Sequence, residues 1–171
     1  AWGYLSRLLP FFRWLFRKGH LLMDPGQDIK IPMFARHCVR PLTPQEVMEL
    51  LSLPPRTLLE RRNQAILEVF YGTGLRLGEV QAMTLSDLFL DQLYCKIPVT
   101  KGGEPRLAPL PPYLVAVLRQ YLKEVRPQLA RSAQEDGLWL TASGLRCTAE
   151  DLGKLTRKAG LRAGLALTPH R

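Results

Sequence analysis

Cysteine is scarce and widely spaced in this chain, which contains Cys38, Cys95 and Cys147. No two of them form a Cys-x-x-Cys pair, so the sequence supports neither a disulfide framework nor a zinc site. Free, scattered thiols are typical of a reducing compartment. We therefore expect a cytoplasmic protein that holds no structural metal.

Long hydrophobic runs are also missing. No stretch of eighteen apolar residues occurs, which excludes an ordinary membrane-spanning helix. The apolar opening is interrupted by basic residues and lacks the cleavage site of a signal peptide. A protein that lies on a membrane surface stays open as a minor alternative, because this basic opening carries Trp2 and Trp14.

Acidic residues are the third shortage, with 15 Asp and Glu against 24 Lys and Arg, a net charge of +9. The excess is concentrated at the two ends: residues 1–40 carry +5, residues 141–171 carry +4, and the middle sums to zero. Such a balance favours a polyanionic partner that is held from two sides. With 46% hydrophobic residues, the chain of 171 residues is predicted to be globular rather than disordered.

Two regions can be separated along the chain. Apolar residues at helical spacing predict a helix over residues 4–18, which Pro10 should kink or divide into two pieces. Residues 24–40 have little periodicity and hold Pro25 and Pro32, which is typical of a linker. We expect a helical remnant over residues 1–23, the linker over 24–40, and a domain over 41–171.

The second region should be mostly α with a small antiparallel β-sheet, an α+β fold. Capping boxes at residues 43–46 and 57–60 predict helices that begin there, and Gly72 and Gly74 should break the second one. Strands are expected at residues 88–90, 93–99 and 106–110, and Pro98 should confine the middle strand to an edge or a bulge. Two further helices are expected at residues 111–125 and 148–160, and the second should end at Gly160.

Three short motifs carry side chains suited to phosphate chemistry. In YGTGLRLGE, two glycines bring Arg76 to the mouth of a helix, where a guanidinium can bind two oxygens of one phosphate. Glu79 lies on the same face and could fix it; an ordinary surface ion pair is the simpler interpretation. In VTKGGEPRL, Lys101 lies at a hairpin tip, and in TPHR, His170 lies in the first turn of a helix. Taken singly, each of these is more often just solvated.

In combination and in this order, the motifs resemble those of the tyrosine recombinases, which include phage integrases and Xer-type resolvases. YGTGLRLGE matches the first arginine box, TKGGEPRLAPLP the hairpin lysine, and TPHR the start of the His-x-x-Arg box. The resemblance covers residues 40–171, and residues 1–35 resemble the last helix of the family's N-terminal core-binding domain.

The resemblance implies DNA strand exchange through a 3′-phosphotyrosine, with no metal or nucleotide cofactor. Arg76 would clamp the non-bridging oxygens, Lys101 would protonate the leaving 5′-oxygen, and His170 would assist at the phosphate. Glu79 would support Arg76 from behind. The family acts as a homo- or hetero-tetramer on two DNA duplexes, so double-stranded DNA is the expected partner.

The sequence departs from the family pattern at its end. Arg171 directly follows His170, so the second clamping arginine and the tyrosine nucleophile would lie downstream of this sequence, and all five of its tyrosines precede the histidine. We interpret both ends as cut and expect this polypeptide not to cleave DNA by itself. A catalytically inactive DNA-binding remnant of a mobile element is the alternative.

Basic residues in and beside two predicted helices are candidates for DNA-backbone contacts. The alternative is a solvated helix face for the C-terminal set and the outer surface of the core-binding domain for the N-terminal set. The candidates are Arg146, Lys154, Arg157 and Lys158 near the C-terminus, and Arg13, Arg17 and Lys18 near the N-terminus.

Overall fold

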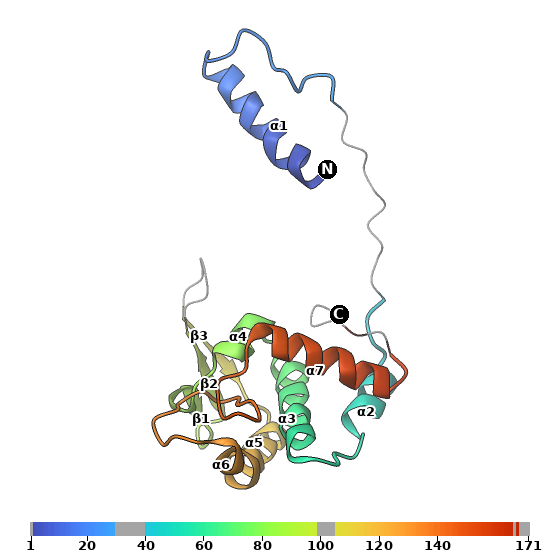
Figure 1. Ribbon diagram of the computed structural model, residues 1–171, viewed down its shortest axis with the longest axis vertical. Helices are drawn as coiled ribbons and strands as arrows, with labels where there is room; N and C mark the ends of the chain where they lie inside the picture. Colours follow the sequence, from blue (N-terminus) through green and yellow to red (C-terminus); the bar gives the residue numbers. More distant parts are fainter. Residues whose placement is uncertain (1, 30–39, 99–104, 166, 168–171) are drawn as a thin grey trace. The chain divides into compact units, whose positions relative to one another are not determined.

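The computed structural model describes residues 2–29, 40–98, 105–165 and 167, in two compact units that comprise Ala1–Val39 and Arg40–Arg171 (Figure 1). The second unit is mostly helical with a small antiparallel sheet, as the sequence predicted. In the part of the chain that the structure describes, no helix is both long and apolar enough to cross a membrane.

The first unit is built around α1 (Trp2–Arg17), which continues through Pro10 without interruption. Of the two alternatives expected at Pro10, a kink or a division into two pieces, the division was wrong. Proline removes a single N–H donor, and its fixed φ is itself helical, so the turns on either side can hold the helix together. The turn after α1 packs closely: a Cβ on Gly26 would come within 2.4 Å of Leu9 Cδ2.

Side-chain caps fix the first two helices of the second unit. In α2 (Pro44–Leu51), Thr43 accepts a hydrogen bond from the Glu46 N–H and Glu46 accepts one from the Thr43 N–H, the capping box that the sequence predicted. Thr57 caps α3 (Leu58–Thr73) in the same way, but the Glu60 carboxylate there accepts from the Arg56 N–H.

Only one of the two predicted breaker glycines ends α3. Gly74 takes the left-handed conformation at φ 62° and is the C-cap. Gly72 lies inside the helix, where a Cβ would come within 2.6 Å of the Tyr113 hydroxyl. Gly72 therefore makes room for a packing neighbour, and the expectation that it breaks the helix was wrong.

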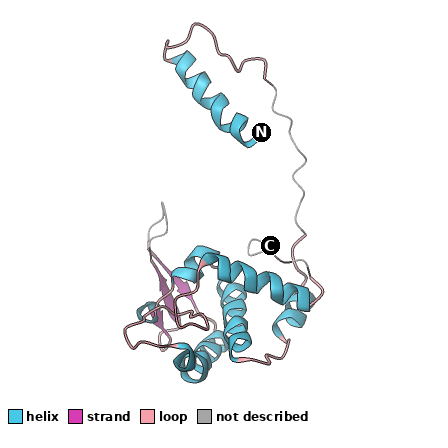
Figure 2. Ribbon diagram, in the orientation of Figure 1, coloured by secondary structure: helices cyan, strands magenta, loops and turns pink. Residues whose placement is uncertain are grey.

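The sheet contains β1 (Leu88–Phe89), β2 (Tyr94–Ile97) and β3 (Arg106–Pro109), antiparallel in the order β1-β2-β3. The strands stand together on one side of the unit's helices (Figure 2). Because β2 is the central strand, the edge position expected from Pro98 was wrong. The strand ends at Ile97, so Pro98 lies just past the ladder and costs it no hydrogen bond.

Helices from both halves of the unit enclose the core. The helix predicted over residues 111–125 is observed as α5 (Pro112–Gln120) and a π-helical turn (Tyr121–Val125), and α6 (Arg126–Leu129) continues beyond its predicted end. The wide turn comes just before Pro127, which has no N–H to continue an α-helical ladder. α3 packs against α5 and the π turn around the buried side chains of Ile66, Leu114, Leu118 and Trp139.

The last helix, α7 (Ala149–Arg162), begins at Thr148 with a capping box to Asp151, as predicted, but continues past Gly160. The prediction that the helix ends at Gly160 was wrong, because this glycine is required by close packing and not by a helix end. A Cβ there would come within 2.7 Å of both the Leu165 carbonyl oxygen and Leu167 Cγ. The glycine lets the chain fold back over the helix, and the turn itself is made later, at Gly164 with φ 70°.

Candidate functional site

Arg76 stands at the junction of α3 and α4 (Leu77–Ala82), where it is the N-cap residue. Gly74 reverses the chain and Leu75 is buried, which anchors the backbone immediately before the arginine. The Arg76 side chain itself is 80% exposed. The sequence thus predicted correctly that a guanidinium is presented at the start of a helix.

Glu79 lies behind Arg76 and is almost completely buried, at 2% exposure. Its Oε2 accepts a hydrogen bond of 2.7 Å from the Arg76 N–H, and its Oε1 lies 3.5 Å from Arg76 Nη1. Burial raises the pKa of Glu79, but hydrogen bonds from the Arg76 backbone and Arg106, with the charges of both arginines, hold it below its ordinary value. The carboxylate is therefore ionised at neutral pH.

Arg106 completes this cluster, and the sequence analysis missed it. Arg106 is the first residue of β3, where it is paired with Ile97. Its Nη2 donates a hydrogen bond of 3.0 Å to Glu79 Oε2. The guanidinium is half-exposed, at 48%. The sequence could have indicated Arg106 as a site residue, because it begins a predicted strand five residues after the hairpin lysine, Lys101.

Two predicted site residues, Lys101 and His170, lie outside the described residues. The strands that flank the predicted lysine loop are nevertheless paired as a hairpin, with Ile97 opposite Arg106 and Cys95 opposite Ala108. The structure thus brings Arg76 and Glu79 together, and the roles of Lys101 and His170 stay predictions.

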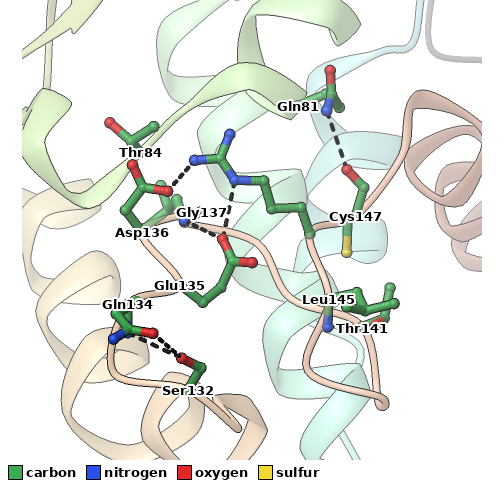
Figure 3. Close-up of polar contacts among 12 residues, drawn as sticks. Gln81, Thr84, Ser132, Gln134, Glu135, Asp136, Gly137, Thr141, Leu145 and Cys147 are labelled. Atoms are coloured by element: carbon green, nitrogen blue, oxygen red, sulfur yellow. Dashed lines mark hydrogen bonds and ion pairs between the residues drawn. The ribbon is translucent and has the colours of Figure 1, made fainter.

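The DNA-binding candidate Arg146 has strong partners within the chain. Its guanidinium pairs with Glu135, at 3.0 Å from Nε to Oε1, and with Asp136. Figure 3 shows these two carboxylates beside Gly137, whose N–H also donates a hydrogen bond to Glu135. In the same view, the side-chain amide of Gln81 donates a hydrogen bond to the carbonyl oxygen of Cys147. The hydrogen bonds that its guanidinium donates to Asp136 and Glu135 raise the pKa of Arg146. This arginine braces the segment that leads into α7.

The three candidates on α7 are exposed and differ in their contacts. Lys154 Nζ lies 2.8 Å from Glu150 Oε1, one helical turn away. Arg157 and Lys158 take part in none of the ion pairs formed among the described residues. On the first unit Arg13, Arg17 and Lys18 are exposed as well, and Arg13 lies 3.7 Å from Asp24.

The helical unit with its three-stranded sheet has the fold of a tyrosine recombinase catalytic domain. The chain belongs to the phage integrase family, whose sequence profile matches residues 40–171. It is 33% identical to a tyrosine recombinase XerD of Listeria innocua, over 98% of this chain and 57% of that protein. A tyrosine recombinase XerC of Roseiflexus sp. is 34% identical over 94% of this chain and 52% of its own length. The chain thus spans little more than half of these relatives.

Solved structures have the same fold. XerA recombinase is similar over 92% of this chain and 54% of its own, with 25% identity and a TM-score of 0.69. The Tn1549 transposon integrase in complex with a circular intermediate DNA matches 98% of this chain and 62% of its own, with 18% identity and a TM-score of 0.79.

Proposed function

We propose that this chain is part of a site-specific recombinase that cuts and rejoins DNA through a 3′-phosphotyrosine intermediate. The observation that carries the proposal is Arg76, an exposed guanidinium whose backbone is anchored by the buried, ionised Glu79. A fixed cation with a free face suits a site where negative charge develops on a phosphate. The order of Arg76, Lys101 and His170 in the sequence adds to this support.

The proposed reaction forms one phosphoester bond and breaks another. A tyrosine oxygen attacks the phosphorus, the bond to the 5′-oxygen breaks, and the covalent phosphotyrosine keeps the energy of the lost bond for rejoining. Arg76 would stabilise the charge on the non-bridging oxygens, a contribution on the order of 10²–10³ in rate. Lys101 would give the leaving 5′-oxygen its proton, and His170 would assist at the phosphate. No tyrosine of this chain is proposed as the nucleophile.

Double-stranded DNA is the proposed partner, bound by a tetramer on two duplexes. Arg157 and Lys158 on α7, with Arg17 and Lys18 on the first unit, are the candidates best suited to phosphate contacts, since all four are exposed and outside the described ion pairs. Integrases of the same fold have been solved with DNA, among them the Tn1549 enzyme and a λ integrase dimer bound to a core site.

Cleavage by the full-length product of the gene tests the proposal. With a supercoiled plasmid that carries the target site, we expect a protease-sensitive covalent complex. Arg76→Ala should reduce it by about 100-fold or more, while DNA affinity changes only about threefold. Equal losses of binding and cleavage would contradict the assigned role. A reading frame that stops after codon 171 would favour the inactive DNA-binding remnant.

A further inference from the structure

One carboxylate, that of Glu79, is shared between two arginines from elements distant in the sequence. Arg76 belongs to the start of α4 and Arg106 to the start of β3, and both contact Glu79. We infer that Arg106 is a positioning residue for the reaction, which acts through Glu79 to hold Arg76 in place. This inference rests on the proposed function of Arg76.

The contact geometry shows what holds Arg76. Its side chain touches Glu79 only at 3.5 Å, whereas its backbone N–H lies 2.7 Å from Glu79 Oε2. The carboxylate therefore fixes the start of the arginine side chain and leaves the guanidinium free to meet a ligand. An arginine whose backbone is already anchored loses less conformational freedom when its side chain binds a phosphate.

Glu79 in turn depends on Arg106. A buried carboxylate is costly unless charge-assisted hydrogen bonds compensate for its lost hydration. Arg106 supplies such a bond at 3.0 Å, shorter than the contact from the Arg76 guanidinium. Without Arg106, Glu79 would keep the neutral Arg76 N–H at 2.7 Å, and its nearest charged donor among the described contacts would be the Arg76 guanidinium at 3.5 Å. The carboxylate would then be held less firmly or turn toward solvent, and the anchor of Arg76 would loosen.

The first test compares two substrates with the full-length protein: an ordinary phosphodiester and a methylphosphonate at the cleaved position. We expect Arg106→Gln to slow phosphodiester cleavage by about 10-fold to 100-fold with DNA affinity within about threefold, and Arg106→Lys to restore most of the rate. A methylphosphonate lacks the charge that Arg76 neutralises, so the defects of Arg76→Ala and Arg106→Gln should both shrink to about threefold. Equal loss on both substrates would show a merely structural role and overturn the inference.

The second test separates action through Glu79 from direct contact with DNA. In a Glu79→Gln background, Arg106→Gln should add less than about threefold, because residues of one network are not additive. A full additional loss would mean that Arg106 meets the phosphate itself, which overturns the inference. Arg119→Gln is the matched control, since Arg119 pairs with Asp91 at 2.5 Å on the exposed surface and should leave the rate unchanged.

The outcomes also separate this inference from the proposed function. If Arg76→Ala has no effect on cleavage, the proposed role of Arg76 fails, and the role of Arg106 with it. If Arg76→Ala abolishes cleavage while Arg106→Gln cleaves like the unmodified protein, the inference alone fails.

Discussion

Arg62 Nη1 donates a hydrogen bond of 2.5 Å to the carbonyl oxygen of Leu140, a residue 78 positions further along the chain. The guanidinium is buried, and its Nε and Nη2 donate to Asn63 Oδ1. Leu140 itself is buried beside Trp139 in the core. One arginine thus connects the first turns of α3 to the segment that precedes α7.

Replacing Arg62 should therefore weaken the fold. In Arg62→Gln the shorter side chain cannot reach Leu140, and a buried carbonyl loses its donor, so we expect the free energy of unfolding to fall by about 2–4 kcal/mol. Urea denaturation followed by circular dichroism measures this. Arg61→Gln is the control, because the neighbouring Arg61 is exposed and lies 3.7 Å from Glu124. Equal losses in the two variants would refute the special role of Arg62.

Two helical glycines should respond oppositely to alanine. In Gly160→Ala the new methyl group would press on Leu165 and Leu167, and we expect a loss of about 1–3 kcal/mol in stability. Gly78 has open space within 4 Å, so Gly78→Ala should stabilise α4 by about 0.5–1 kcal/mol. Thermal or urea unfolding of both variants checks the sign. A stabilised Gly160→Ala variant would contradict the observed close packing.

Features determined by neighbouring residues were predictable from the sequence. Thr43, Thr57 and Thr148 cap the helices predicted after them, because the acceptor and the N–H that it binds are only three residues apart. The three strands were also found at their predicted places, and Arg76 stands at the start of a helix.

Features that depend on distant contacts were not predictable. Gly160 was expected to end a helix, but its role is set by Leu165 and Leu167, which fold back over it. Pro98 suggested an edge strand, but pairing on both sides of β2 places that strand in the centre. Arg106 was overlooked because its partner, Glu79, is 27 residues away and only the fold brings the two together.

The buried thiol of Cys95 predicts a loss of stability in alkali. Burial raises its pKa from 9.0 to about 11 in the folded chain, although nearby Arg106 opposes the change. As the pH rises above 9, the unfolded thiol loses its proton while the folded thiol keeps it, so the unfolded state is favoured. Between pH 8 and pH 10 we expect Cys95 to account for about 1 kcal/mol of lost stability. Urea titrations of the reduced protein and of Cys95→Ala measure the difference; an unchanged pH dependence in the variant would rule this out.

Arg157 and Arg146 were both predicted to contact DNA, but their surroundings in the structure distinguish them. Arg157 is exposed on α7 and outside the described ion pairs, whereas Arg146 is paired with Glu135 and Asp136. Each phosphate contact contributes about −0.9 to the slope of log affinity against log salt. Arg157→Gln should therefore make the slope shallower by about 0.9 without affecting unfolding.

The matched variant Arg146→Gln should show the reverse, because its charge is already neutralised within the protein. We expect a lower urea midpoint, through loss of the contacts to Glu135 and Asp136, and a salt slope close to that of the unmodified chain. Fluorescence anisotropy with a labelled duplex at several salt concentrations measures both slopes. If the salt slope becomes shallower by the same amount in both variants, Arg146 must exchange its carboxylate partners for a phosphate when DNA binds. Its contacts with Glu135 and Asp136 would then form only in the DNA-free protein.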